Sequence, residues 1–490
     1  MKKIEINKLS IMPDSTIRQA MQAIGKGELG VAFVVDETGA LKSLLTDGDV
    51  RRALLAGFGL QSTITVIETN KPIVAKSDNS AAEISGIFND KIRIIPVIDD
   101  ANKIIDVHFR DKRTHIAVTN PLFDEEEIEL LNECIVSGWV SSAGPFVTKF
   151  EDMMAEYCGT KYAVSCSSAT SGLHLALLAK NIGPGDEVIV PSLTFIATAN
   201  AVSYTGATPV FIDSDISTWN IDPSLIADAI TPKTKAIIPV HLYGHPADMD
   251  PINDIAKKHN LYVIEDAAEA QGAKYKNKMV GSLADVAVFS FFGNKIITTG
   301  EGGMIVTDDA DIADKCRILR DHGMSKDRRY WHEVIGYNYR MTNMQAALGV
   351  AQMSKINKIL LRKKEIAEEY KSHLEGLPGV TLPANMEWVE NVYWLYTILI
   401  DSSISGCEID KLMPELKRQG IDSRPVFPPV HKQPVYDTGL TLPLSEKISL
   451  YGISLPSAPD IRNEEIANIC MLIKEGIETK ITKSNFGSGF

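Results

Sequence analysis

The sequence predicts an α/β protein with a mainly parallel central sheet, a smaller C-terminal α/β lobe and a preceding N-terminal α/β module. Between Pro121 and about residue 300, short apolar segments alternate with helical ones, which is typical of a parallel sheet with helices on both faces. After Ile356 a charged helical stretch leads to a further strand-like segment, YWLYTILI. The first ~115 residues instead consist of two similar halves. We therefore expect domains at 1–115, 116–356 and 357–482, and a disordered tail at 483–490.

The two N-terminal halves form a degenerate repeat. The first reads DSTIRQAMQAI and then GVAFVVDETGALKSLLTDGDVRRAL, and the second reads DNSAAEISGIF and then RIIPVIDDANKIIDVHFRDKR. Asp36 and Asp99, which are 63 positions apart, end equivalent apolar runs. Each half predicts a helix, two short buried strands joined by a turn, and a closing helix. Because one half could not cover its own sheet, we expect the two to pack face to face.

This repeat resembles a pair of CBS domains, the Bateman module. The resemblance implies a cleft for an adenosine or guanosine nucleotide, whose ribose contacts an Asp three residues after a Ser or Thr. Thr46 and Asp49 match this pattern in the first half. In the second half Asp111 is present, but His108 replaces the hydroxyl residue. A regulatory nucleotide site and a purely structural or dimerising module therefore stay open as alternatives.

The central sheet is predicted from seven segments: YAVSC, EVIVPS, PVFID, AIIPV, YVIED, VAVFS and MIVTD. In front of them Asp124 and three glutamates predict the start of a helix, because acidic residues favour the first helical turn. Ligands of parallel sheets bind at the carboxyl ends of the strands, so polar residues at those ends are the first candidates for a site.

Two of these strand ends carry polar groups suited to a ligand that has both an anionic group and a positively charged group. In SCSSATSGLHLALLA a strand ends at Cys166, and Thr170 and Ser171 then open a helix, whose free N–H groups and hydroxyls could bind an anion. In YVIEDAAEA an apolar strand delivers Asp266, and a buried carboxylate needs a positive partner. Taken alone, the first motif is equally well explained by an ordinary helix start, and Asp266 is better explained as a helix N-cap.

Two further strand ends contribute an amine and an aromatic ring. In VAVFSFFGNKIITTGEGGMIVTD a strand ends at Ser290 and a tight loop carries Lys295. Desolvation would lower the pKa of this lysine and expose a neutral amine that can form a Schiff base. In SLTFIATANAV, Phe195 is either a ring that stacks on a cofactor or an ordinary core aromatic. An anion site, then Asp, then Lys about 30 residues later is the order typical of the aspartate-aminotransferase fold.

From Pro121 to Ile477 the sequence resembles the DegT/DnrJ/EryC1/StrS sugar aminotransferases, which have the PLP-dependent aspartate-aminotransferase fold (type I). The matching motifs, in order, are GWVSSAGPFVTKFE, SLTFIATANAV, PVHLYGHPADMD, EDAAEAQGA, FSFFGNKIITTGEGG, LRDHGMS, GYNYRMTNMQAALG and SRPVFPPVH. The resemblance implies that the cofactor is pyridoxal 5'-phosphate.

The resemblance also implies a role for each matching residue. Lys295 would hold the cofactor and move a proton to and from the substrates, Asp266 would pair with the pyridine nitrogen, and Glu269 would lie near the ring hydroxyl. The other expected cofactor contacts are Thr170, Ser171, Phe195 and Ser290, with Asn338 reaching the phosphate of a neighbouring subunit. The candidates for binding the nucleotide sugar are Tyr330, His332, Arg424 and His431.

Within the family, FFGNK, TTGEGG and RYWHEVIGYNYRMTN look most like the members that use glutamate to aminate C4 of GDP-4-keto-6-deoxymannose, giving GDP-perosamine for surface polysaccharides. A UDP-linked 4-keto sugar of the legionaminic or bacillosamine type is an alternative, because it would need the same catalytic residues. A second alternative is a nucleotide-sensing protein without activity. A 3-dehydratase of the family would carry His in place of Lys295. Because Asn338 completes a neighbouring site, a homodimer or larger assembly is expected.

Composition limits the other function classes. The net charge of −13 argues against bulk nucleic-acid binding. No apolar run has the length of a membrane span, and the start, MKKIEINKLSIMPDS, lacks the apolar stretch of a secretory signal, so a cytoplasmic location is expected. The six cysteines are scattered and form no Cys-x-x-Cys pair, so we expect neither a metal site nor a disulfide framework.

Overall fold

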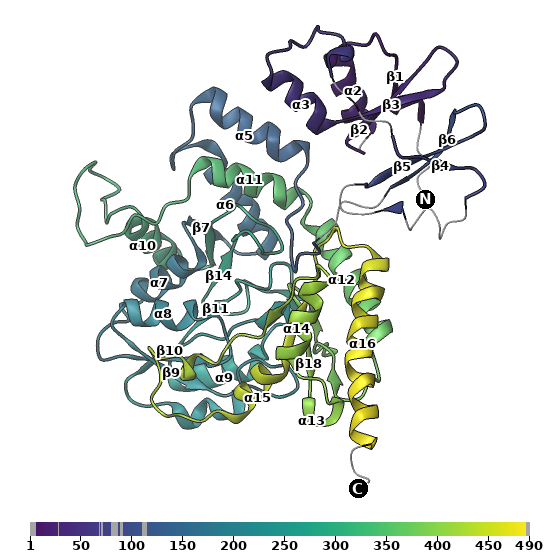
Figure 1. The fold of residues 1–490 in the computed structure, drawn as a ribbon. Coiled ribbons are helices and arrows are strands. Elements are labelled where there is room, and N and C mark those ends of the chain that lie inside the picture. Colours follow the sequence, from purple (N-terminus) through teal and green to yellow (C-terminus); the bar gives the residue numbers. More distant parts are fainter. Residues whose placement is uncertain are drawn as a thin grey trace. The chain divides into compact units, whose positions relative to one another are not determined.

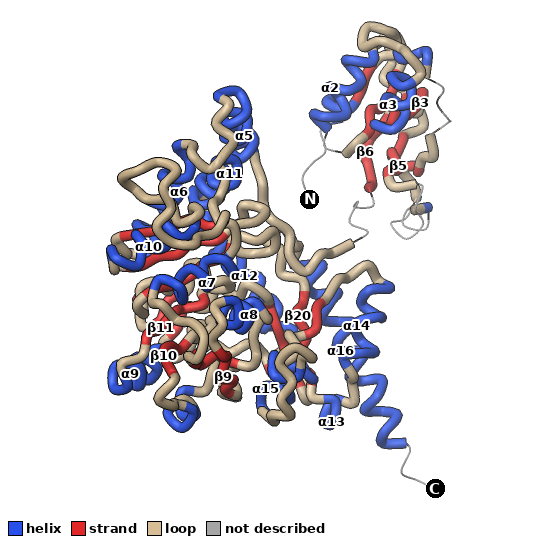
Figure 2. The backbone as a smooth tube through the Cα atoms, turned by 90° about the vertical axis from the view of Figure 1, so that its left-hand side faces the viewer, coloured by secondary structure: helices blue, strands red, loops and turns tan. Residues whose placement is uncertain are grey.

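The structure is a computed structural model that describes residues 6–27, 29–67, 69, 72–79, 87–88, 92–109 and 115–486. The chain forms two compact units, Met1–Thr114 and His115–Phe490, which we call unit 1 and unit 2. Figures 1 and 2 show the elements of each unit. No helix in this described part is long and apolar enough to cross a membrane.

Unit 1 contains two three-stranded sheets of the same topology. The first consists of β1 (Ser10–Ile11), β2 (Val31–Val35) and β3 (Leu41–Thr46), and the second of β4 (Ala75–Lys76), β5 (Ile94–Ile98) and β6 (Ile104–Phe109). In each sheet the first strand is parallel to the second, and the second is antiparallel to the third. The helices of the first half are α1 (Ile6–Leu9), α2 (Ile17–Gly27) and α3 (Asp47–Leu55). The helices predicted for the second half lie largely outside the described residues.

The turns of the two halves of unit 1 meet. Asp36 and Asp99 each accept backbone N–H bonds that close the turn between two strands. Ala40 and Lys103, which are also 63 positions apart, pair in an antiparallel bridge. The two halves share one cluster of buried side chains: Leu9, Val31, Phe33, Leu41, Ile98 and Val107. The predicted repeat is therefore confirmed, and its halves share a core.

Unit 2 is built on a seven-stranded sheet in the order β7-β15-β14-β11-β10-β8-β9. Its strands are β7 (Tyr162–Cys166), β8 (Glu187–Pro191), β9 (Thr208–Ile212), β10 (Thr234–Ile237), β11 (Tyr262–Asp266), β14 (Val286–Ser290) and β15 (Gly303–Thr307). All neighbours are parallel except β15, which runs antiparallel to β14 and β7. Every strand comes from one of the seven predicted segments, so the mainly parallel α/β fold is confirmed.

Helices cover both faces of this sheet. Successive residues of a strand point to opposite faces, so each strand contributes side chains to two cores. In β14, Val286 and Val288 belong to one core, and Ala287 and Phe289 to the other. The first core also takes side chains from α7 (Ala169–Ala179), α8 (Ala197–Tyr204) and α10 (Ala310–Arg320). The other takes them from α5 (Glu125–Ser137), α6 (Pro145–Cys158) and α11 (Asn343–Ser354), and α9 (Met249–His259) has a smaller core with β8, β10 and β11. Figure 1 shows this arrangement.

The C-terminal lobe of unit 2 has its own antiparallel sheet, in the order β16-β18-β20-β19. Its strands are β16 (Val380–Thr381), β18 (Tyr396–Ile400), β19 (Arg424–Pro425) and β20 (Gly452–Leu455), and its main helices are α12 (Ile356–Leu374), α14 (Ile409–Arg418) and α16 (Asn463–Phe486). The short elements β12 (Lys274–Tyr275), β13 (Lys278–Met279), β17 (Val389–Glu390), α13 (Ser402–Ser405) and α15 (Pro443–Tyr451) complete the unit. Helix α16 includes residues 483–486 of the segment predicted as a tail, and 487–490 lie outside the described residues.

Candidate active site

A cavity of about 300 Å³ lies at the carboxyl ends of β11 and β14 and at the start of α7. The residues that line it include Thr170, Phe195, Thr198, Asp266, Glu269, Ser290, Lys295, Trp394 and Phe427. Trp394 and Phe427 follow α12 in the chain, so the C-terminal lobe closes one side. The cavity therefore lies where ligands of parallel sheets are expected.

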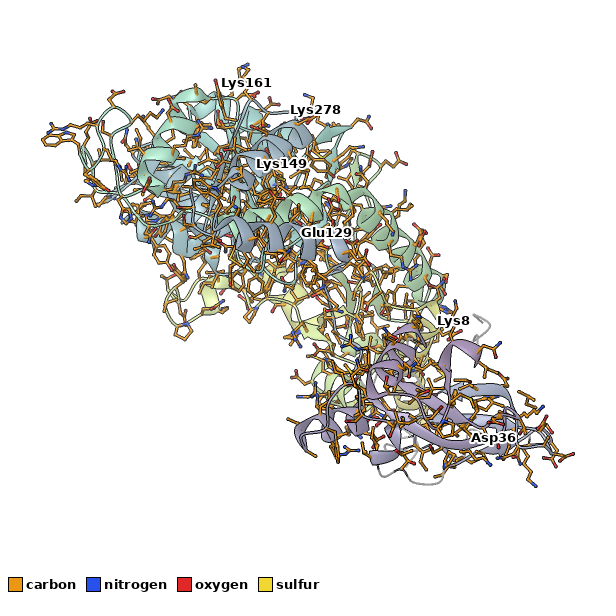
Figure 3. The ribbon with its side chains drawn as sticks, turned by 90° about the horizontal axis from the view of Figure 1, so that it is seen from above. Lys8, Asp36, Glu129, Lys149, Lys161 and Lys278 are labelled. Atoms are coloured by element: carbon orange, nitrogen blue, oxygen red, sulfur yellow. The ribbon has the colours of Figure 1, made fainter. Side chains whose placement is uncertain are left out.

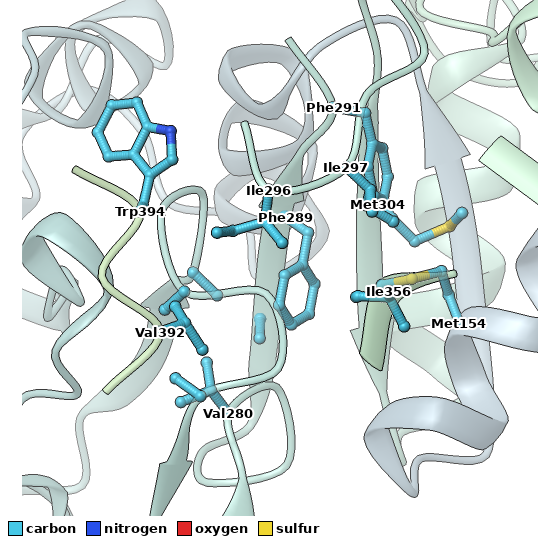
Figure 4. Close-up of a cluster of buried hydrophobic side chains, with 14 of the residues drawn as sticks. Met154, Val280, Phe289, Phe291, Ile296, Ile297, Met304, Ile356, Val392 and Trp394 are labelled. Atoms are coloured by element: carbon cyan, nitrogen blue, oxygen red, sulfur yellow. The ribbon is translucent and has the colours of Figure 1, made fainter. Parts of the chain in front are cut away.

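Lys295 lies in the loop between β14 and β15, and its amine faces the cavity. The Nζ atom is 3.7 Å from Oε1 of Glu269 and 3.5 Å from the centre of the Trp394 ring. Burial is the main influence on this amine and lowers the pKa of Lys295. The next two residues, Ile296 and Ile297, are buried in the hydrophobic core (Figure 4). The loop is thus anchored directly behind a desolvated amine, as a Schiff-base lysine requires.

Asp266 ends β11 and is 5% exposed. The Thr198 hydroxyl donates a 2.7 Å hydrogen bond to its Oδ2 atom, and the N–H of Ala268 donates to Oδ1 at 3.2 Å. Burial, the largest influence, raises the pKa of Asp266. A buried carboxylate whose hydrogen-bond donors are neutral favours a cationic ligand beside it, and a protonated pyridine nitrogen is such a ligand.

Glu269 lies three residues further, in a turn after β11, and is 4% exposed. Its Oε2 atom accepts a 2.8 Å hydrogen bond from the backbone N–H of Tyr243. Tyr243 adopts a left-handed backbone conformation with φ of 55°, which an L-residue seldom takes without support. Burial raises the pKa of Glu269 to about 7, although Lys295 acts in the opposite direction. Glu269 can therefore hold or release a proton beside the lysine near neutral pH.

The start of α7 lines one part of the cavity, where its backbone N–H groups could bind an anion. Ser168 is the N-cap residue, and Thr170 lines the cavity together with Ser290. Gly303 allows a close approach from β15, because a Cβ atom there would lie 2.5 Å from the carbonyl of Ser168. The Ser171 hydroxyl instead donates back to the Ser168 carbonyl at 2.7 Å. The helix N-terminus, Lys295 and Asp266 together fit the phosphate, carbonyl and pyridinium groups of pyridoxal phosphate.

Phe195 also lines the cavity and is 57% exposed. Its ring lies 5.8 Å from that of Phe427, at an interplanar angle of 57°. A half-exposed aromatic at the mouth of a cavity is not a core residue, so the geometry favours the interpretation of Phe195 as a stacking ring.

Three other predicted residues lie on the segment between α10 and α11 and do not line this cavity in the single chain. Tyr330 is 74% exposed, and His332 and Asn338 are exposed as well. His332 donates from Nδ1 to the carbonyl of His322 at 2.9 Å, and Asn338 accepts from Arg340 at 3.3 Å. Their exposed positions leave them free to meet another molecule rather than their own cavity.

The remaining two sugar-binding candidates are engaged elsewhere in unit 2. Arg424 pairs with Asp422 and does not line the cavity. His431 is fully buried, and its two ring nitrogens contact the hydroxyl of Ser192 at 2.5 Å and the carboxylate of Glu446 at 3.1 Å. In this geometry His431 ties the segment after β8 to the C-terminal lobe, which is a structural role.

In unit 1, Thr46 and Asp49 form a capping box at the start of α3. The Thr46 hydroxyl donates to Oδ2 of Asp49 at 2.6 Å, and the Asp49 N–H donates back to the hydroxyl at 3.2 Å. His108 lies on β6, 3.7 Å from Asp106. Asp111 lies outside the described residues.

Sequence reasoning missed four residues of the site. Thr198, Gln271 and Tyr243 occur inside quoted motifs, but no spacing marks them as partners of Asp266, the lysine loop and Glu269. Gln271 joins both sides of that loop, since its amide donates to the Ser290 carbonyl at 2.5 Å and accepts from Ile297 at 3.1 Å. Trp394 is 99 positions from Lys295, so only the tertiary fold brings it there.

In the described part of the chain no group of ligating side chains could hold a metal ion.

Comparisons with known proteins place this site in context. The model of the DegT/DnrJ/EryC1/StrS aminotransferase family matches residues 121–474, and the CBS domain model matches residues 3–56. The chain is 48% identical to the GDP-perosamine synthase of Caulobacter vibrioides (72% of this chain, 96% of that protein) and to that of Escherichia coli O157:H7 (74% and 98%). It is also similar to Spr1654 from Streptococcus pneumoniae, solved in its PLP form, with a TM-score of 0.70 and 30% identity over 74% of this chain and 99% of that one.

Proposed function

The chain belongs to the DegT/DnrJ/EryC1/StrS aminotransferase family, and from this premise we propose that it transfers the amino group of glutamate to C4 of GDP-4-keto-6-deoxymannose, yielding GDP-perosamine. The observation that carries the aminotransferase chemistry is the desolvated Lys295 amine, held beside Glu269 in the same cavity as Asp266. The GDP sugar is supported by the 48% identity to two GDP-perosamine synthases.

Pyridoxal phosphate, when bound, supplies an electrophilic carbon for amines and a ring that accepts the electron pair left by a departing proton. Asp266, oriented by Thr198, would stabilise positive charge on that ring. Thr170, Ser290 and the start of α7 would bind its phosphate, and Phe195 would cover one face.

Lys295 performs the proton transfers. In each half-reaction its neutral amine takes a proton from one carbon, becomes an ammonium and returns a proton to another carbon, so that overall glutamate loses its α-proton and C4 of the sugar gains one. Glu269, held by the Tyr243 N–H, keeps a carboxyl group 3.7 Å from this nitrogen throughout. The cavity shields the amine from bulk water, which keeps the pKa of Lys295 low enough for the base role.

An absorbance experiment tests the reaction and the substrate together. Glutamate is expected to bleach the yellow form of the purified enzyme. Addition of GDP-4-keto-6-deoxymannose is then expected to restore the colour, whereas the UDP-linked 4-keto sugar is not. Recovery with the UDP sugar alone would keep the enzyme class and reject the substrate. A Lys295→Ala variant that kept its activity would reject the catalytic assignment.

We further propose a homodimer. The charged side chain of Lys161 lies at the edge of unit 2 (Figure 3), but α5 exposes three large apolar residues. Ile128, Ile135 and Val136 are 68%, 63% and 79% exposed. An apolar helix face of this kind is typical of a contact surface. A dimeric mass in light scattering, lost in an Ile135→Glu variant but kept in Glu129→Lys on the same helix, is the expected result.

A regulatory nucleotide in unit 1 and a cytoplasmic location complete the proposal. The capping-box pair Thr46 and Asp49 carries the polar atoms that would meet a ribose. All six cysteines are buried thiols outside any disulfide, as is typical of a reducing compartment. GDP or ATP is expected to raise the melting temperature of the wild type and not of Asp49→Ala, with Asp47→Ala as the control. No shift with either nucleotide would favour a structural module.

A further inference from the structure

The indole ring of Trp394 covers the reactive amine of the site. The centre of the ring is 3.5 Å from Nζ of Lys295, and the Trp394 side chain is almost completely buried. Its Nε1–H donates a 2.7 Å hydrogen bond to the carbonyl of Asn294, the residue directly before the lysine. The ring is thus fixed to the same loop whose amine it faces.

A second lysine fixes the backbone of Trp394 from the other side. Lys363 on α12 is 3% exposed. Its ammonium donates to the Trp394 carbonyl at 2.9 Å, to the Ser457 carbonyl at 2.7 Å and to the Ser457 hydroxyl at 2.9 Å. These contacts use all three donors of the ammonium group. Burial lowers the pKa of Lys363 to about 7, so these three hydrogen bonds favour its charged form against desolvation.

We propose that Trp394 is a further catalytic residue, whose ring face stabilises the ammonium form of Lys295 during proton transfer, and that Lys363 is the positioning residue that holds this ring. The inference rests on the proposed function, in which Lys295 takes and returns a proton. When the substrate carbon gives up its proton, the electron pair stays with the carbon side and the lysine gains the positive charge. A cation over the face of a desolvated tryptophan is strongly favoured.

Carboxyl groups around Lys295 also favour its ammonium form, but unlike the ring they have other partners or change their charge. Glu269 lies 3.7 Å from Nζ, and Asp266 and Glu301 line the same cavity. The charge of Glu269 changes near neutral pH, because burial raises the pKa of Glu269 to about 7. Asp266 is expected to pair with the cofactor. The quadrupole of the indole ring does not titrate, so it favours the ammonium form at every pH.

The test measures the lysine itself rather than turnover. Cofactor-free protein is labelled with trace acetic anhydride over a series of pH values, and mass spectrometry of the Lys295 peptide gives the pKa of that amine. In Trp394→Leu the pKa of Lys295 is expected to fall by about one unit, because the cation loses its ring. Trp394→Phe keeps an aromatic face and is expected to show a smaller fall.

The Lys363→Met variant tests whether Lys363 acts on Lys295 by holding the Trp394 ring or only through its own positive charge. If Lys363 holds the ring, its loss displaces the ring and the pKa of Lys295 falls. If Lys363 acts only through its positive charge, its removal raises the pKa of Lys295, which would overturn the positioning role. Unchanged Lys295 titration in a folded Trp394→Leu or, should that variant unfold, in Trp394→Met, which also lacks an aromatic face, would overturn the role of the ring. Loss of activity in Lys295→Ala alongside that result would leave the proposed function intact.

Discussion

Thr198 donates a 2.7 Å hydrogen bond to Asp266, and both side chains are buried. The bond favours the charged carboxylate against the burial that raises the pKa of Asp266. We expect Thr198→Val to weaken cofactor binding roughly tenfold or more, since a hydrogen bond to a charged group contributes ~1.5 kcal/mol or more. Absorbance titration of the cofactor-free variant measures this. Thr205→Val, at the end of the same helix and away from Asp266, is the control and should bind normally.

Glu269 makes the stability of the cofactor-free protein depend on pH. Burial raises the pKa of Glu269 to about 7 from an ordinary value of 4.5, so the folded state holds its proton more tightly than the unfolded state. Its contribution to stability is present below the ordinary value and is lost as the pH rises through about 7. The loss is on the order of 3 kcal/mol. The melting temperature should therefore fall more steeply with rising pH in the wild type than in Glu269→Gln. The same dependence of melting temperature on pH in both proteins would contradict this.

Gln271 is expected to hold the shape of the lysine loop. Its amide joins the Ser290 carbonyl to the Ile297 N–H, on either side of Lys295. Gln271→Leu leaves two buried backbone groups without this partner, which costs about 1–3 kcal/mol for each. We predict a lower melting temperature together with weaker cofactor binding. Gln271→Glu can still accept a hydrogen bond from Ile297, so its melting temperature and cofactor affinity should lie between those of the wild type and Gln271→Leu. If Gln271→Leu behaves like the wild type, Gln271 does not hold the loop.

Gly303 is expected to tolerate no side chain. A Cβ atom there would lie 2.5 Å from the Ser168 carbonyl, so Gly303→Ala must displace the start of α7. We predict a loss of stability of about 1–3 kcal/mol, the usual cost of overpacking, and weaker binding of the cofactor phosphate. Gly183→Ala is the matched control, because its Cβ atom would meet its nearest neighbour at an ordinary 3.6 Å.

His431 is expected to affect stability more than substrate affinity. It is buried between Ser192 and Glu446, outside the cavity. His431→Leu should lower the melting temperature and leave KM for the nucleotide sugar nearly unchanged in the fraction that remains folded. A large rise in KM without a change in melting temperature would instead indicate that His431 binds the nucleotide sugar.

The strands of the sheet and the two central residues of the site could be predicted because their signals are local. The strands read as short apolar runs; Asp266 ends one of them, and Lys295 comes five residues after the end of another. Trp394 could not be predicted, because a residue 99 positions away becomes a neighbour only through packing of the C-terminal lobe. The sequence also could not show that both ring nitrogens of His431 have partners inside the protein, because Ser192 and Glu446 are brought to it by the tertiary fold.

The single antiparallel strand β15 has a kinetic consequence. It follows β14 after a loop of only 12 residues, whereas every parallel pair in this sheet needs a longer crossover. Pairing of β14 with β15 therefore closes the shortest loop in the sheet and has the lowest entropic barrier. Lys295 lies within that loop, so the ends of the loop can meet early, while the contacts with Gln271 and Trp394 that shape it must wait for the rest of the unit to assemble.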